Sequence, residues 1–197
     1  MGLNSIHPTP AIVAIVGMAG SGKTILSKWL HSLGLPMVRF GDVVINEVLR
    51  RGLEVTSLNE QSVREELRHK GGMDVCAKLS LPGIYEQLRT QRPVIVDGLY
   101  SFSEYKTLRA EFGDGMLVVA VFTSRDLRYA RLTSRAERPL TVHEAKARDY
   151  AEIENIEKGG PIALADHTLL NNGSKDDLIG HAQDLFTPVL ENLGSLK

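Results

Sequence analysis

The sequence predicts an α/β fold in which helices cover both faces of a five-stranded parallel sheet. Two observations favour this fold. Short apolar runs rich in β-branched residues recur along the chain, and segments with the apolar spacing of helices separate them. A chain that alternates strands with helices forms right-handed crossovers, which make the strands parallel. The length of 197 residues suits a single domain.

Five segments are expected to form the strands. They are "AIVAIV" (11–16), "PMVRF" (36–40), "PVIVD" (93–97), "LVVAVF" (117–122) and "HTLLN" (167–171), of which the second and the last are the weaker patterns. The runs do not alternate between apolar and polar residues, as a strand with one solvated face would. We therefore expect both faces of the sheet to be buried.

Helices are expected between and after these strands, at 21–33, 41–52, 59–72, 74–91, 103–113 and 174–194. Pro82 should interrupt the fourth of them, because proline has no N–H for the helical hydrogen bond. The interval 41–92 contains more helix than one crossover needs, so a helical insertion is expected there. The second long interval, 125–161, is expected to form a basic, movable lid.

The composition excludes several classes of protein. The net charge of −1 gives no general attraction to nucleic acid or to anionic membranes. The single cysteine, Cys76, allows no intramolecular disulfide and no cysteine-cluster metal site, and we expect it to be buried. No apolar run approaches the ~18 residues that cross a bilayer, and the start of the chain lacks the pattern of a secretory signal. A cytoplasmic location is expected, although Gly2 and Ser5 fit the short and common myristoylation pattern.

The stretch "IVGMAGSGKT" (15–24) contains the glycine-rich pattern of a phosphate-binding loop, between an expected strand and an expected helix. Its glycines permit backbone conformations in which several amides converge on phosphate oxygens, and the helix that follows points its positive end at them. The lysine would reach the β- and γ-phosphates, and the threonine hydroxyl would bind Mg²⁺. The expected residues for binding ATP and Mg²⁺ are Gly17, Gly20, Ser21, Gly22, Lys23 and Thr24. This motif specifies the α/β fold as the three-layer fold of P-loop NTPases.

Two aspartates are expected at the edge of the sheet where the phosphate loop lies. Asp97 ends the apolar run "VIVD", where a second acidic residue would support Mg²⁺. Asp42 follows the expected strand 36–40, and it could orient a phosphoryl acceptor and take a proton from an acceptor hydroxyl. The alternative for both is a plain structural role, since aspartate is common in turns and at helix N-caps.

Four arginines in the expected lid have the spacing of one helix face. Arg128, Arg131, Arg135 and Arg138 lie at i, i+3, i+7 and i+10. Such a face would repel itself unless an anion lay on it, so we expect the lid to grip the triphosphate, with Arg148 contributing from a second arm. Arg128, Arg131 and Arg135 would act with Lys23 and Asp42 in catalysis, stabilising charge on the transferred group. A solvated surface stripe is the alternative.

With these motifs in place, the chain resembles the P-loop kinases of the nucleoside monophosphate kinase type, a group that includes dephospho-CoA kinase. The resemblance is greatest to an uncharacterised, adenylate-kinase-related branch, and it extends from "IVGMAGSGKT" through "FGDVV" and "VIVDG" to "IALADHTLLNNGS". It implies that 41–92 binds the acceptor and 125–161 closes over the donor. It also implies that the loop after the last strand contacts adenine, through Asn171, Asn172 and Gly173.

The chain departs from that family at two positions on the acceptor side. Ile45 and Tyr100 stand where the relatives carry arginines that reach the acceptor phosphate. Neither side chain replaces the charge or the bidentate hydrogen bonding of arginine. The acceptor is therefore expected to differ from a plain nucleoside monophosphate, with Arg39, Arg50, Arg51, Arg64 and Arg68 available to compensate.

The leading functional hypothesis is a kinase that transfers the γ-phosphoryl group of ATP–Mg²⁺ to a small-molecule or nucleotide acceptor. The alternative is a nucleotide-binding regulatory ATPase or switch protein with no small-molecule acceptor, which the two missing arginines favour. An enzyme acting on nucleic acid is disfavoured by the near-neutral charge and by the aromatic content of 6%.

Overall fold

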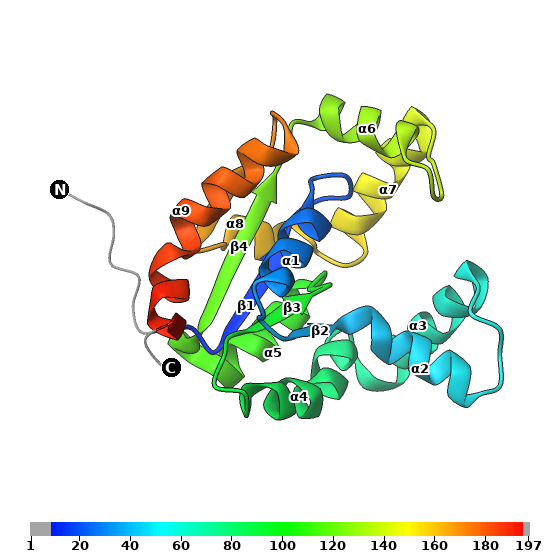
Figure 1. Ribbon diagram of the computed structural model, residues 1–197. Coiled ribbons are helices and arrows are strands. Elements are labelled where there is room, and N and C mark those ends of the chain that lie inside the picture. Colours follow the sequence, from blue (N-terminus) through cyan, green and yellow to red (C-terminus); the bar gives the residue numbers. More distant parts are fainter. Residues whose placement is uncertain (1–8, 195–197) are drawn as a thin grey trace.

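The computed structural model describes residues 9–194 and confirms the predicted five-stranded parallel sheet (Figure 1). The strands are β1 (Ile12–Val16), β2 (Met37–Arg39), β3 (Val94–Asp97), β4 (Met116–Phe122) and β5 (His167–Leu170). Their order across the sheet is β2-β3-β1-β4-β5, and every neighbouring pair is parallel. The carboxyl ends of all five strands therefore lie along one edge, which is the edge where ligands bind in such sheets.

Helices connect the strands at the predicted places. They are α1 (Lys23–Ser32), α2 (Phe40–Arg50), α3 (Ser57–Gly71), α4 (Val75–Leu88), α5 (Phe102–Phe112), α6 (Arg125–Ser134), α7 (Val142–Glu154), α8 (Gly159–Ala163) and α9 (Lys175–Gly194), with the short 3-10 turn η1 (Gly113–Gly115) before β4. Within residues 9–194, no helix is both long and apolar enough to span a membrane.

Each face of the sheet has its own apolar core. On one face, Leu26 and Leu30 of α1 and Phe186 of α9 pack against inward-facing residues of β1 and β4. On the other face, α2, α4 and α5 contribute Val48, Ile84 and Leu108. This arrangement gives the three layers that the apolar runs predict, and it fixes the sheet as a rigid base for the loops at its carboxyl edge.

Helices α2, α3 and α4 occupy the interval predicted as an insertion, and they project from one side of the sheet (Figure 1). Cys76 is buried there, as expected. The expected interruption at Pro82 is wrong, because α4 runs unbroken from Val75 to Leu88. Pro82 and Lys78 both lie on the exposed side of the helix, so water can reach the carbonyl that loses its hydrogen bond.

The segment 125–161 forms α6, α7 and the start of α8, above the opposite side of the sheet edge (Figure 1). The predicted single helical face of four arginines is wrong, because α6 ends at Ser134 and leaves Arg135 and Arg138 in the loop that follows. The segment is also basic only in its first part. It contains eight Lys or Arg and seven Asp or Glu in total, since α7 supplies carboxylates that the arginine spacing did not reveal.

Gly2 and Ser5, the residues of the myristoylation pattern, lie outside the described residues.

Candidate functional site

The phosphate loop connects β1 to α1, and its shape depends on glycine. Gly17, Gly20 and Gly22 all have positive φ angles, of 142°, 79° and 104°. A Cβ atom on Gly17 would lie 2.5 Å from the carbonyl oxygen of Val121, and one on Gly22 would lie 2.2 Å from Nδ2 of Asn171. Both backbone conformation and space therefore require glycine in this loop.

The loop is held from behind by the segments that follow β4 and β5. The amide nitrogen Nδ2 of Asn171 donates to the carbonyl oxygen of Ser21 at 2.7 Å, and the hydroxyl of Thr123 donates to the same oxygen at 3.0 Å. Asn171 is 2% exposed. The structure thus places the Asn171 side chain beneath the phosphate loop, while its neighbour Asn172 accepts a hydrogen bond from the backbone N–H of Ser124.

Lys23 begins α1, and its ammonium group turns back over the loop to donate to the carbonyl oxygen of Met18 at 2.9 Å. Burial, and after it the nearby positive charge of Lys158, lower the pKa of Lys23 to about 7. A group of this kind is stabilised by an anion, because a bound phosphate would compensate both effects.

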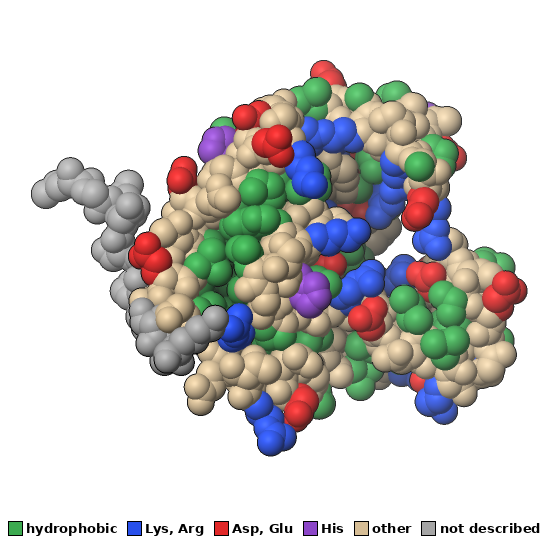
Figure 2. All heavy atoms as spheres, in the orientation of Figure 1, with side chains coloured by type: hydrophobic (Ala, Val, Ile, Leu, Met, Phe, Trp, Pro, Cys, Tyr) green, Lys and Arg blue, Asp and Glu red, His purple; other side chains and the backbone are tan. Residues whose placement is uncertain are grey.

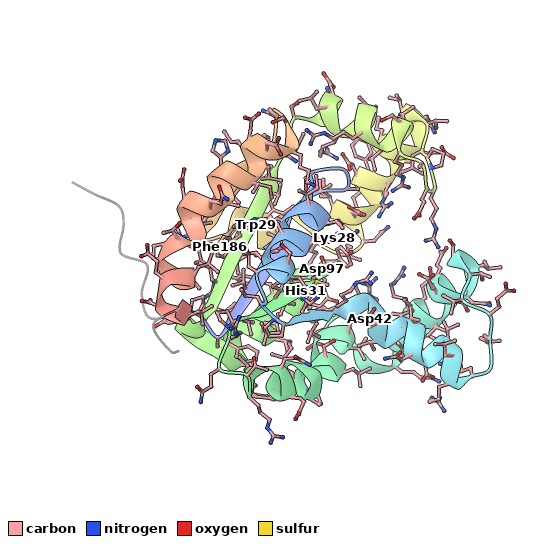
Figure 3. The ribbon with its side chains drawn as sticks, in the orientation of Figure 1. Lys28, Trp29, His31, Asp42, Asp97 and Phe186 are labelled. Carbon is pink, nitrogen blue, oxygen red and sulfur yellow. The ribbon has the colours of Figure 1, made fainter. Side chains whose placement is uncertain are left out.

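Asp97 ends β3 beside α1, as Figure 3 shows. The hydroxyl of Ser27 donates to Oδ1 of Asp97 at 3.4 Å, which joins the two elements. Thr24 lies one turn before Ser27 on the same side of α1, and its side chain is exposed. A threonine hydroxyl and a carboxylate on facing elements fit a Mg²⁺ ion that also binds phosphate oxygens and water.

Metal binding by protein ligands alone is a different matter. Among residues 9–194, no three His, Cys, Asp or Glu side chains lie together in a group that could hold a metal ion. A magnesium ion here would therefore depend on the nucleotide for part of its coordination shell.

Asp42 lies in the first turn of α2, about half exposed, and not at the end of a strand (Figure 3). Arg39, the last residue of β2, lies between the two aspartates: its guanidinium is 3.9 Å from Asp42 and 3.9 Å from Asp97. The sheet edge therefore carries a row of alternating charges from Asp97 to Asp42.

A cleft of about 420 Å³ opens beside the phosphate loop, between α1 and α6. Its walls include Lys23 and Thr24 of α1, Arg131 of α6 and Arg135 of the following loop. Arg131 is held in place by Thr123 Oγ1 and by the carbonyl oxygen of Gly173, each at 3.3 Å. Two arginines thus face the phosphate loop across a space of the size of a small-molecule site.

Arg128 has a different environment from its neighbours in the predicted lid. It is 7% exposed, and its two terminal nitrogens both contact the carboxylate of Asp149 on α7, at 3.0 and 2.5 Å. It also donates to the carbonyl oxygen of Ala19 in the phosphate loop at 3.0 Å. The structure therefore places Arg128 as a link between α6, α7 and the loop.

Arg138 spans the space between the lid segment and the insertion. Its guanidinium is 3.8 Å from Oε1 of Glu60 on α3. Figure 2 shows Lys and Arg side chains, in blue, around the hollow between these two parts of the molecule. Arg138 therefore lies away from the 420 Å³ cleft, whose walls do not include it.

Sequence reasoning missed a group of charged residues on the β3 side of the phosphate loop. Lys158 is 2% exposed, and its ammonium donates to Glu152 at 2.6 Å. The same ammonium lies 4.8 Å from the centre of the Tyr100 ring, while Arg148 donates to the other oxygen of Glu152 at 2.9 Å. Burial opposes the charge on Glu152, but Lys158 and Arg148 together hold its pKa below the usual range.

A sequence signal for this group does exist. Ala145, Asp149 and Glu152 follow one another at i, i+4 and i+7, which places them on one helix face. Carboxylates on a helix face that also carries alanine can be buried, and a buried carboxylate needs a cation beside it. Their partners, Arg128 and Lys158, could not be identified without the packing of α7.

Comparison with known proteins agrees with this geometry. The family model of the AAA domain matches residues 16–157. A UPF0200 protein of Thermococcus kodakarensis is 35% identical over 92% of this chain and 100% of its own length, and one of Aeropyrum pernix is 36% identical over 87% of this chain and 89% of its own.

Solved structures share the fold at low sequence identity. A gluconokinase of Sinorhizobium meliloti covers 97% of this chain, with 99% of its own, at a TM-score of 0.55 and 16% identity. A shikimate kinase of Bacteroides thetaiotaomicron covers 90%, with 98% of its own, at a TM-score of 0.58 and 14% identity. The chain therefore has the fold of P-loop kinases, and it belongs to the AAA-domain family and to the UPF0200 proteins.

Proposed function

We propose that this protein is an ATP-dependent phosphotransferase, which moves the γ-phosphoryl group of ATP–Mg²⁺ to a small acceptor. The observation that carries the proposal is the position of Lys23. Lys23 lines a cleft with Arg131 and Arg135, and its ammonium also interacts with the charge of Asp97. Asp97 belongs to a differently built region, the sheet edge that Arg39 connects to Asp42. A phosphotransferase needs two such regions, one for the donor and one for the acceptor.

On the donor side, the amides of the phosphate loop and Lys23 bind the phosphates, and Arg131 and Arg135 close over them. Thr24 and Asp97 would hold Mg²⁺, which would neutralise charge that develops on the transferred group. Arg128 acts through its contact with the carbonyl of Ala19, which keeps the loop in shape. Asn172 and Gly173 border the nucleotide from the β5 side, with Asn171 as their support.

On the acceptor side, Asp42 orients an acceptor hydroxyl and accepts its proton. The insertion and the segment 125–161 enclose the acceptor, with Arg138 at the rim. Ile45 lies part-buried on α2 and adds no charge to this pocket. We therefore propose that the acceptor is not a plain nucleoside monophosphate. A small molecule that carries a hydroxyl group fits this pocket better.

The test is a coupled assay of ADP formation from ATP–Mg²⁺. Candidate acceptors are AMP, CMP, UMP, GMP, dTMP, CoA precursors, and small sugars and hydroxy acids. A true acceptor should raise ADP formation about 100-fold or more over ATP alone, because a positioned acceptor replaces bulk water as the nucleophile. Lys23→Ala should lower this rate by about 100-fold or more.

Lys28→Ala is the matched control, since Lys28 lies on the same helix with an exposed side chain (Figure 3). It should leave the rate unchanged. If ADP forms only when a protein partner is added, the regulatory ATPase is the better description. Fast turnover of any of the five monophosphates would overturn the statement about the acceptor.

A further inference from the structure

Lys158 is a buried lysine that the proposed donor and acceptor sites do not use. It ends the connection between α7 and α8, where its backbone N–H donates to the carbonyl of Glu152 at 3.1 Å and its ammonium donates to the carboxylate of the same residue at 2.6 Å. Glu152 therefore fixes both ends of this lysine. A buried ammonium is unfavourable unless its surroundings compensate its charge.

The fold places Lys158 beside the phosphate loop on the β3 side. Its ammonium lies 4.8 Å from the centre of the Tyr100 ring, and Tyr100 comes three residues after Asp97 at the end of β3. Asp97 pairs in register with Ile15 of β1, two residues before the phosphate loop begins at Gly17. In agreement with this path, the ammonium groups of Lys158 and Lys23 lie close enough for their positive charges to repel each other.

The charges around Lys158 do not balance. Glu152 is shared between two cations, because Arg148 donates to its second oxygen. The neighbouring carboxylate of Asp149 is already paired with Arg128. Lys158 and Arg148 thus share the one carboxylate of Glu152, and one positive charge is left over. Such a site is completed by an anion.

Resting on the proposed function, we infer that Lys158 is a second phosphate-binding lysine, which contacts the terminal phosphate of ATP from the β3 side when it leaves Glu152. The walls of the 420 Å³ cleft include Arg131 and Arg135 but not Lys158. The two arginines therefore approach the phosphates from one side and Lys158 from the other. Only the terminal phosphate extends toward Asp97 and the acceptor. Lys158 therefore contributes to the binding of ATP but not to the binding of ADP.

Tyr100 has a defined part in this arrangement. Tyrosine carries no charge, but its ring holds the ammonium of Lys158 by a cation–π contact. The backbone N–H of Tyr100 donates to the carboxylate of the buried Glu104 at 2.8 Å. This hydrogen bond fixes the backbone from which the ring extends. Tyr100 thus contributes a positive charge to the site indirectly, because its ring holds Lys158 there.

The test measures the affinities of the protein for ADP–Mg²⁺ and for a non-hydrolysable, imido-bridged analogue of ATP–Mg²⁺ by calorimetry. Lys158→Met keeps the unbranched shape and most of the length of the side chain and removes its charge. It should weaken binding of the ATP analogue by about tenfold and leave ADP binding within about twofold, since a charged hydrogen bond to the terminal phosphate is lost. Lys158→Arg should restore most of the preference for the triphosphate.

Lys146→Met is the matched control, because Lys146 is an exposed residue of α7 whose ammonium also lies near a tyrosine ring, 5.6 Å from the centre of that of Tyr150. It should change neither affinity. Intact ADP binding by Lys158→Met shows that the variant is folded, and a purely structural lysine would shift both affinities together or neither. Either of those results overturns the inference while the kinase proposal stands. If the unmodified protein binds neither nucleotide, the proposed function itself fails.

Discussion

The insertion (41–92) and the segment 125–161 differ in where their ion pairs lie, at the surface or buried. In the insertion, Glu47 and Glu66 lie at the surface and form a chain of ion pairs through Arg51, at 2.8 and 2.5 Å. In the segment 125–161, Arg128 and Asp149 form a buried pair with both side chains 8% exposed. Exposed pairs are easily exchanged with water, whereas a buried pair fixes geometry. The segment 125–161 is thus held more rigidly than the insertion, as suits their proposed roles in binding the donor and the acceptor.

The largest expected effect, on nucleotide binding, comes from a substitution in the phosphate loop where Gly22 packs against Asn171. Gly22→Ala should abolish nucleotide binding, because φ is 104° and the new Cβ would meet Asn171 Nδ2 at 2.2 Å. Gly180→Ala is the control, since nothing lies within 4 Å of a Cβ at that position on α9. Binding of a fluorescent ATP analogue measures both. Retained binding in Gly22→Ala would show that the loop is not held by Asn171.

The next effect concerns the buried pair. Asp149→Ala should lower the free energy of unfolding by about 3–5 kcal/mol, because it leaves the Arg128 guanidinium buried without its partner. Urea denaturation measures this change. The variant should also bind ATP more weakly, since Arg128 holds Ala19 of the phosphate loop. If the free energy of unfolding fell by less than about 1 kcal/mol, the buried pair would stabilise the protein no more than the exposed pairs of the insertion do.

A smaller effect is expected where the two regions meet. Glu60→Gln removes the 3.8 Å contact with the largely exposed Arg138. It should change the free energy of unfolding by less than about 1 kcal/mol, as exposed pairs do. It should nevertheless free the loop 135–141, so limited proteolysis there should become faster. Unchanged cleavage would mean that this contact does not restrain the loop.

The smallest effect is a pH dependence in the insertion. Hydrogen bonds from Arg50 and Arg51 lower the pKa of Glu47 from 4.5 to about 2, and Arg51 and Lys70 do the same for Glu66. A lowered pKa in the folded state means that the stabilisation is complete above pH 4.5 and is lost as the pH falls to about 2. Glu47→Gln should therefore differ from the unmodified protein at pH 6 and match it near pH 2.

Denaturation curves between pH 2 and 6 measure this dependence. Glu54→Gln is a suitable control, since Glu54 is exposed and forms no ion pair within the described part of the chain. A difference between Glu47→Gln and the unmodified protein that persists at pH 2 would contradict the assignment.

The sequence was sufficient for those features that depend on local patterns. Apolar runs located all five strands, and the glycine spacing located the phosphate loop, because both signals lie within a few adjacent residues. The environments of Arg128 and Lys158 could not be obtained in this way. Their partners, Asp149 and Glu152, come from α7, and only the packing of α6, α7 and α8 brings them together.

The contact between Asn171 and Ser21 joins residues 150 positions apart. The proposed nucleotide site is therefore assembled from the two ends of the folded domain. During synthesis the glycine-rich turn leaves the ribosome early, yet it lacks the support of Asn171 until β5 has followed. A fragment that stops before this strand would keep the entire motif and still lack a competent site, so the motif alone is a poor guide to which shortened forms bind nucleotide.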